Sequence, residues 1–439
     1  MAHTELSRTP SGAGNRKTFT ISLWVKRGEI STENLLLKID GGTNNTNYIE
    51  MKFDSGDRLL MGGYTSNFLR TNRLFRDPNA WYHIVWRVDT TQSTADDRVR
   101  LYVNGVQETF FGQRNNPGQN DDMAVNSTTA HLLGSTLDGY LAQYIIADGQ
   151  SYAPTTFGST DSNGVWTPNA SPSVTFGTNG FKLDFKLTGS SADASGFGAD
   201  SSGQNNHFAT TNIATNPNTK DSPTNVFATF NALDKRAGGV DFSNGNTKVV
   251  TSGSNRNYVT LTQAFTSGKW YMECKFTSDV THAYVGFCDM SDLQMDGASA
   301  LGNQSNEAAV GSTGYYEKNN SVTNSWAGTF ATGDILGLCL DCDNNRFTLS
   351  KNGQFADGSG NYDEANPTAY ITYTAGNFMN FAFGEGTGGA TATCEINTGN
   401  SPYAIASGNA DANGYGNFEY AVPSGYYALC TKNIGAYGG

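Results

Sequence analysis

The sequence predicts an all-β protein in which two tandem β-sandwiches (jelly rolls) are joined by an ordered irregular connector. Its 439 residues suffice for about two or three domains of roughly 150 residues each. Gly occurs 51 times and aromatic residues reach 12%, whereas charged residues reach only 15%. This composition favours short strands and turns over helices. We find no long segment with apolar residues at helical spacing.

Alternating apolar residues predict the strands of the first sandwich. Every second residue is apolar in the segments 19–26 and 81–89, as in a strand with one buried face. Asn104-Gly105 between two such runs predicts a hairpin, because a type I′ turn needs positive φ at both central residues. The predicted core of this sandwich comprises Phe19, Ile21, Leu23, Tyr82, Ile84, Trp86, Val88, Leu101 and Val103.

The second sandwich shows the same plan with a different sequence. Ile335 to Leu340 is a nearly continuous apolar run, which is typical of a central strand covered on both faces. A second Asn-Gly hairpin turns at Asn352-Gly353. The predicted core comprises Trp270, Met272, Cys274, Phe276, Phe347, Leu349, Phe381 and Phe383.

These patterns predict four consecutive parts. They are a sandwich at 1–165, a connector at 166–231, a sandwich at 232–400, and C-terminal strands at 401–439 that close the second sandwich. The connector is rich in Ser, Thr, Asn, Gly and Pro, but its Phe residues need burial. We expect Phe181 to Phe185 to add a strand to the first sandwich, whose N-terminal edge strand is otherwise missing or borrowed.

Charge and cysteine content exclude several classes of function. The net charge is −12, which argues against a nucleic-acid partner because phosphate contacts need clustered Lys and Arg. No transmembrane span or signal peptide is visible, so we expect no membrane insertion. The six cysteines lie in the second half, and the strand pattern buries several of them. We expect free thiols formed in a reducing cytoplasm.

Two stretches resemble known domain families. Residues 5–150 resemble the LamG-like, concanavalin-type lectin/glucanase domain, and residues 240–385 are similar to a SPRY domain. The first resemblance rests on Phe19 to Lys26, Trp81-Tyr82-His83-Ile84-Val85, Leu101-Tyr102-Val103-Asn104-Gly105 and Leu137-Asp138-Gly139-Tyr140. The second rests on Gly268-Lys269-Trp270-Tyr271-Met272-Glu273, Tyr284-Val285-Gly286-Phe287, Gly333-Asp334-Ile335-Leu336-Gly337 and Lys351-Asn352-Gly353. The sandwiches are thus expected to be concanavalin-like.

Further segments are similar to structural proteins of marine, cyanophage-like bacteriophages. They include Leu6-Ser7-Arg8-Thr9-Pro10, Gly180-Phe181-Lys182-Leu183-Asp184-Phe185, Asp200-Ser201-Ser202-Gly203, Asp221-Ser222-Pro223-Thr224-Asn225 and Pro423-Ser424-Gly425-Tyr426. The resemblance implies a virion surface protein, made in the host cytoplasm and used as a tail fibre, appendage or particle decoration for host attachment.

The chemistry of an enzyme is not evident in the sequence. Glucanases of this fold need two carboxylates flanking the glycosidic bond. Glu50 and Asp54 come closest to such a pair, but Lys52 lies between them. A strand face exposed to solvent explains this pattern of charged residues. His83 is expected to be structural. Cys339 and Cys342 point to opposite faces of a strand, so they cannot easily chelate one ion. We predict no catalytic residue and no enzyme.

Exposed aromatic residues on loops are the remaining candidates for a binding site. Sugars stack on aromatic faces while amide groups fix their hydroxyls. Tyr64, Asn67 and Trp326 are therefore candidate glycan-binding residues, with core packing as the alternative role for each aromatic side chain. We predict no metal site and no cofactor, although Asp-rich turns such as Asp121-Asp122 leave Ca²⁺ open as a ligand.

The sequence as a whole favours a non-enzymatic phage virion surface protein. We expect it to bind other virion proteins and host-cell-surface glycans, and to form a homo-oligomer within the particle. The alternative is a polysaccharide-degrading or carbohydrate-binding lectin-type protein of a marine bacterium, which the missing carboxylate pair and signal peptide make less fitting.

Overall fold

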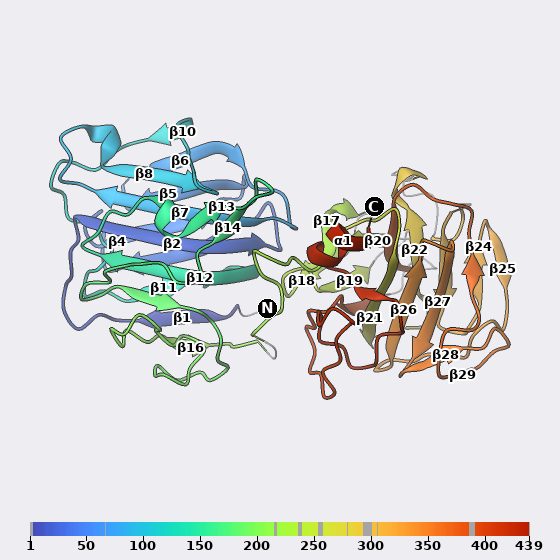
Figure 1. The fold of residues 1–439 in the computed structure, drawn as a ribbon. Helices are drawn as coiled ribbons and strands as arrows, with labels where there is room; N and C mark the ends of the chain where they lie inside the picture. Colours follow the sequence, from blue (N-terminus) through green and yellow to red (C-terminus); the bar gives the residue numbers. More distant parts are fainter. Residues whose placement is uncertain are drawn as a thin grey trace. The chain divides into compact units, whose positions relative to one another are not determined.

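A computed structural model describes residues 3–65, 67–214, 217–235, 239–252, 258–278, 280–292, 301–304, 306–385 and 391–438. Contacts divide the chain into two compact units, which are shown in Figure 1. The first unit ends at Asn218 and also takes in Ser222–Thr224, and the second begins with Thr219–Asp221 and resumes at Asn225. Almost all regular structure is β, as predicted.

The first unit is a sandwich of two antiparallel sheets (Figure 1). In its described residues, eight strands form one sheet in the order β10 (Phe111–Arg114), β6 (Asn67–Leu74), β5 (Arg58–Gly63), β4 (Tyr48–Phe53), β3 (Asn34–Asp40), β11 (His131–Leu133), β1 (Glu5–Arg8), β16 (Ala209–Thr211). Six form the other in the order β15 (Phe181–Leu183), β12 (Gly139–Asp148), β2 (Thr18–Arg27), β7 (Trp81–Asp89), β8 (Val99–Val103), β9 (Val106–Gln107).

Side-chain alternation along β2 and β7 places the first core between these sheets. The two strands pair antiparallel, with Leu23 opposite Ile84 and Ile21 opposite Trp86. Every residue predicted for this core is buried in one cluster, so the predicted register is confirmed. The Asn104-Gly105 turn also forms as predicted, with φ values of 49° and 79°.

The segment expected as a connector supplies edge strands to both sheets of the first unit. Strand β15 pairs with β12, and β16 pairs with β1. The added strand ends at Leu183 rather than at Phe185, because Phe185 adopts a positive φ of 52° and turns its ring towards Phe197. The outer face of the six-stranded sheet is covered by residues 150–176, which include η2 (Pro154–Thr156) and the hairpin β13 (Gly158–Thr160) and β14 (Trp166–Pro168).

Buried aspartates hold the irregular backbone of the first unit in place. The Asp148 carboxylate accepts the backbone N–H groups of Asn15 at 2.6 Å and of Asn179 at 2.9 Å. Asp200 accepts the backbone N–H groups of Lys182 at 2.9 Å and of Asn206 at 2.8 Å. These bonds satisfy donors that no sheet ladder reaches, which lets chain segments without regular structure be buried.

The second unit is also a sandwich of two sheets (Figure 1). As far as the structure describes it, one sheet has seven strands in the order β17 (Phe230–Lys235), β20 (Tyr258–Leu261), β31 (Met379–Glu385), β22 (Ala283–Asp289), β23 (Ala308–Gly311), β24 (Tyr316–Lys318), β25 (Ser321–Thr323). The other sheet runs β18 (Val240–Ser243), β19 (Lys248–Ser252), β32 (Thr391–Asn397), β21 (Lys269–Ser278), β26 (Ile335–Asp341), β27 (Arg346–Lys351), β28 (Gln354–Ala356), β29 (Tyr362–Glu364). Strand β30 (Ile371–Thr372) joins β27, and β33 (Tyr427–Ala428) joins β21 in parallel.

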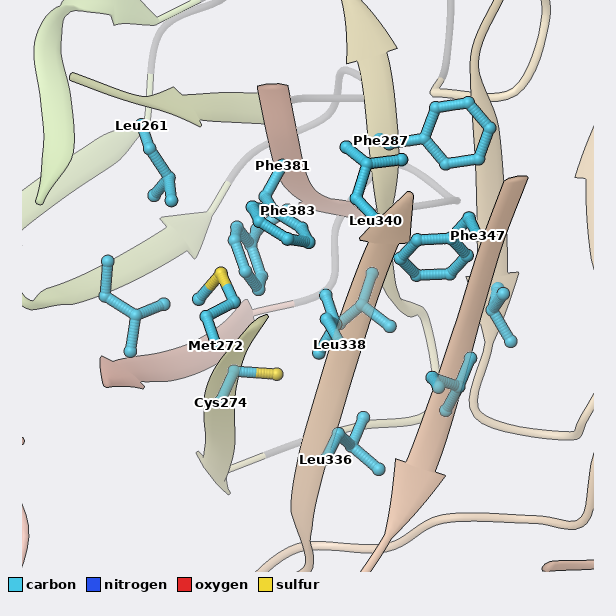
Figure 2. Packing of buried hydrophobic residues seen from close by; sticks show 14 of the residues in the cluster. Leu261, Met272, Cys274, Phe287, Leu336, Leu338, Leu340, Phe347, Phe381 and Phe383 are labelled. Carbon is cyan, nitrogen blue, oxygen red and sulfur yellow. The ribbon is translucent and has the colours of Figure 1, made fainter. Parts of the chain in front are cut away.

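The second core also follows the predicted pattern. Figure 2 shows Met272 and Cys274 of β21 packed with side chains of β26 and with Phe381 and Phe383 of β31. Every residue predicted for this core lies in the same buried cluster. The second Asn-Gly hairpin is present as well, with φ values of 49° at Asn352 and 83° at Gly353.

The C-terminal tail differs from the expected strands. Among its described residues, only β33 is a strand, and the chain then forms the single α-helix, α1 (Thr431–Tyr437). Asn433 explains the change, because its buried amide bonds to Asp411 at 2.7 Å and to the carbonyl of Ala428 at 2.9 Å, which fixes a helical turn there. Two short 3-10 helices, η1 (Ala95–Asp97) and η3 (Met290–Asp292), complete the regular structure described.

Glu273 fastens the tail to the outer face of β21. Its fully buried carboxylate accepts the backbone N–H groups of Glu419 at 2.9 Å and Tyr420 at 2.7 Å, together with the Asn397 amide at 3.1 Å. Burial raises the pKa of Glu273 to about 7, although these hydrogen bonds act in the opposite direction.

The Glu273 carboxyl predicts a specific pH dependence of stability. Because its pKa in the folded state lies above the ordinary value of 4.5, its contribution to stability is full below about pH 4.5 and is lost as pH rises towards 7. Between pH 4.5 and 8, the free energy of unfolding of the second unit should fall more in the wild type than in Glu273→Gln, by up to about 3 kcal/mol. Urea unfolding at both pH values measures this. Parallel pH dependences in the two proteins would contradict it, and Asp363→Asn, at an exposed position, should follow the wild type.

Candidate functional site

The outer face of the eight-stranded sheet carries an open hollow of about 530 Å³. Strands β4, β5, β6 and β10 lie side by side there and supply most of its wall. The lining residues are Tyr48, Glu50, Gly63, Tyr64, Thr65, Asn67 and Gln113. We call this feature the β4–β10 hollow.

Strand alternation and one glycine shape the hollow. Ile49 and Met51 point into the core, so Tyr48 and Glu50 point outwards. Gly62 lies opposite Glu50 in the register of β4 and β5. A Cβ atom at position 62 would lie 2.9 Å from Leu60 Cδ2 and 3.1 Å from both Glu50 Cγ and Asn67 Oδ1, so a larger residue would displace the Glu50 and Asn67 side chains that line the hollow.

One lysine and two carboxylates form a connected group on one side of the hollow, with a net charge of −1. The Tyr48 hydroxyl donates to Glu50 Oε2 at 3.0 Å, and Lys52 Nζ lies 2.9 Å from Glu50 Oε1 and 2.8 Å from Glu33 Oε1. Burial and the Glu50 carboxylate raise the pKa of Tyr48 to about 12, so this phenol is a donor at neutral pH. Burial acts to lower the pKa of Lys52, but its bonds with Glu33 and Glu50 outweigh burial and raise it.

The opposite side presents amide groups and an aromatic ring. Asn67 Nδ2 donates to Gln113 Oε1 at 3.1 Å. Within the described chain, this leaves the Asn67 side-chain oxygen Oδ1 and the Gln113 side-chain amino group Nε2 for a ligand. Tyr64 is 51% exposed and meets Tyr48 edge to face, with ring centroids 5.8 Å apart. The hollow thus combines an accessible ring with adjacent hydrogen-bond donors and acceptors.

The structure brings together two of the three predicted ligand-binding residues. Tyr64 and Asn67 both line the hollow. Trp326 does not, because it is 7% exposed and packs in the core of the second unit, edge to face with Tyr316. The structure shows the alternative role, core packing, and the prediction that Trp326 binds a glycan is wrong. Sequence reasoning missed Tyr48 and Gln113, which only the pairing of β4 and β10 with their neighbours brings to this site.

The carboxylates considered for glycoside hydrolysis have other partners. Glu50 is bonded to Tyr48 and Lys52 as described. Asp54 follows the end of β4 and accepts the backbone N–H groups of Gly56 at 2.9 Å and Arg58 at 3.0 Å, in addition to the Arg58 side chain at 3.1 Å. Asp54 therefore stabilises the turn between β4 and β5.

His83 is held as a neutral, buried side chain. Trp166 Nε1 donates to His83 Nδ1 at 2.9 Å, so the ring proton resides on Nε2, which lies 2.9 Å from the Ser22 hydroxyl. Burial lowers the pKa of His83 to about 3. The ring also stacks on Trp24 with centroids 4.7 Å apart. Since Nε2 already carries a proton, it cannot take one from Ser22, and the pair has the geometry of a packing contact.

The cysteines and acidic residues do not form a metal-binding cluster in the part of the chain that the structure describes. Cys339 packs with Tyr271 and Phe355 on the outer face of its sheet, whereas Cys342 lies in the main core. The two thiols therefore point to opposite faces, as predicted. Across the described ranges, no helix is long and apolar enough to span a bilayer.

Comparison with known proteins places the hollow within a recognised type of domain. Residues 3–149 match the model of the concanavalin A-like lectin/glucanases superfamily. The β4–β10 hollow lies within this range. A comparison with curated protein sequences gave no significant match.

Solved structures similar to this chain include SPRY domains. The SPRY domain of human HERC1 has a TM-score of 0.31 and 12% identity, with 38% of this chain and 96% of that chain covered. The TRIM65 PSpry domain has a TM-score of 0.30 and 13% identity, with 39% and 88% covered. Stonustoxin has a TM-score of 0.31 and 15% identity, but only 27% of its chain is covered, against 39% of this one.

Proposed function

We propose that this chain is a non-enzymatic surface protein of a bacteriophage particle, and that its first unit binds a host-cell glycan in the β4–β10 hollow. The observation that carries the glycan proposal is the half-exposed ring of Tyr64 beside the Asn67–Gln113 amide pair. An aromatic ring provides a stacking face for a pyranose, and adjacent amides bind its hydroxyls. A concanavalin A-like lectin/glucanases match over the same residues is consistent with carbohydrate recognition.

The chemistry around the hollow supports binding without hydrolysis. A glycosidase needs one carboxylic acid and one carboxylate free to act on the two sides of a glycosidic bond. Glu50 is instead committed to Tyr48 and Lys52, and Asp54 to the turn at Gly56 and Arg58. A bound glycan would thus find hydrogen-bonding groups but no acid and base pair.

The particle assignment rests on the short segments that resemble virion proteins of marine bacteriophages. They include Leu6-Ser7-Arg8-Thr9-Pro10 in β1 and its flanks, and Asp200-Ser201-Ser202-Gly203, whose aspartate anchors the backbone around β15. In this proposal the chain binds other virion proteins, assembles as a homo-oligomer on the virion surface, and uses neither a cofactor nor a metal.

Glycan binding is tested with purified full-length chain on a panel of neutral, carboxylated and sulfated polysaccharides. We expect retention on at least one polysaccharide, and at least a tenfold loss of affinity in Tyr64→Ala and in Gly62→Val, because one removes the stacking face and the other displaces the Glu50 and Asn67 side chains that line the hollow. Phe110→Ala, which changes a 74% exposed aromatic side chain outside the hollow, is the control and should bind like the wild type. Unchanged binding in both hollow variants, at an unchanged melting temperature, would refute the site.

The particle assignment is tested on phage virions purified from a host that carries the gene. Mass spectrometry should find the chain as a stoichiometric virion component, and release of reducing ends from the retained polysaccharide should stay at background. Absence from the virions, or steady release of sugar, would favour the alternative of a polysaccharide-degrading or lectin-type bacterial protein.

A further inference from the structure

Arg70 stands beside the β4–β10 hollow on the same face of the sheet. It follows Leu69, which points into the core, so the Arg70 side chain points outwards. In the register of the sheet it lies opposite Leu60 on one side and opposite Gln113 on the other. Gln113 lines the hollow. Directly opposite residues have Cβ atoms about 4.5–5.5 Å apart, so the guanidinium of Arg70 is within reach of a ligand held by Gln113.

The guanidinium of Arg70 lacks the partners that neighbouring arginines have. Its Nε is buried and has no hydrogen-bond partner, and no carboxylate in the described residues forms an ion pair with it. By contrast, Arg58 pairs with Asp54 at 3.1 Å, Arg73 with Glu108 at 2.9 Å, and Arg114 with Asp96 at 3.0 Å. The buried Nε is out of reach of a ligand, so an anion would bind the two terminal Nη groups, which form no hydrogen bond within the described chain.

The lysines on this face are held in ion pairs. Lys52 is bonded to both Glu50 and Glu33, and Lys38 lies 3.2 Å from Asp40. Arg70 is therefore an unpaired positive charge on a chain whose net charge is −12. Because the chain as a whole repels anions, an anionic ligand would depend on this local positive charge beside the hollow.

We infer that the β4–β10 hollow selects an anionic glycan, whose carboxylate or sulfate ester binds Arg70 while the sugar ring stacks on Tyr64. The planar guanidinium donates two parallel hydrogen bonds to two oxygens of such a group, which a neutral sugar cannot match. This inference rests on the proposed glycan-binding function and adds the class of ligand. Binding should weaken as salt is raised, since part of it is electrostatic.

Two matched pairs of polysaccharides test the charge directly. Polygalacturonate is compared with its methyl ester, and carrageenan with its desulfated form, so that each arm removes only the anionic group and the arms separate carboxylate from sulfate. We expect the full-length chain to bind at least one anionic form at least tenfold more tightly than its neutral partner. Arg70→Gln should abolish this preference with an unchanged melting temperature, and Arg70→Lys should restore part of it. Arg73→Gln, the same change on the same strand at an ion-paired residue, should stay within twofold of the wild type.

Each contrary outcome has a distinct meaning. Equal affinity for anionic and neutral forms, with Tyr64→Ala still weakening both, would overturn the anionic class and leave the glycan site intact. A preference for anionic forms that survives Arg70→Gln would overturn the role of Arg70. Failure to bind any polysaccharide of the wider panel would overturn the proposed function itself, and this inference with it.

Discussion

Buried carboxylates that accept backbone N–H groups are the constraint on which both units depend. Each sandwich carries long irregular segments, and their amide groups must find acceptors when they are covered. Asp148 and Asp200 supply these acceptors in the first unit, and Asp411 and Glu273 supply them in the second. A buried carboxylate is costly unless several donors surround it. Each of these four carboxylates has several donors. Replacing one of the four side chains would therefore leave several buried amide groups without an acceptor at once.

Irregular segments cover the outer face of one sheet in each unit. In the first unit, residues 150–176 cover the six-stranded sheet, where Phe157 packs on Val85 and Ile145. In the second unit, the tail held by Glu273 covers the outer face around Tyr271. The outer face of the eight-stranded sheet around Glu50 and Tyr64 instead remains accessible, and the β4–β10 hollow lies there. The proposed ligand site therefore lies on the face of a sheet, where rigid strands hold most of its side chains in place. Tyr64 lies at the rim of this site.

Local patterns in the sequence were sufficient to predict the strands and the residues of both cores. Alternation around Leu23 and Met272 fixed which face each strand buries, and positive φ at Asn104 and Asn352 followed from turn chemistry. The helix at the C-terminus was not predictable in this way. It depends on the Asn433 amide reaching Asp411, 22 residues earlier, and a short apolar run cannot reveal such a contact.

The candidate site was only partly predictable, for a related reason. Tyr64 and Asn67 lie in a turn-rich segment that looks exposed in the sequence. Trp326 also lies in a segment that looks exposed in the sequence, but its side chain is buried in the core of the second unit. Gln113 and Arg70 matter through cross-strand pairing, and the register between β6 and β10 has an irregularity that no alternation pattern specifies. Anchoring aspartates such as Asp200 were likewise indistinguishable from ordinary turn residues.

The central proposal is that a glycan binds on the outer face of the eight-stranded sheet. Hydrogen–deuterium exchange of the full chain, with and without a saturating amount of a retained polysaccharide, tests this most directly. The account predicts slower exchange in peptides that cover residues 48–65 and 111–115, with unchanged exchange in the second unit. Protection confined to the second unit, or to the covered face around His83, would contradict it.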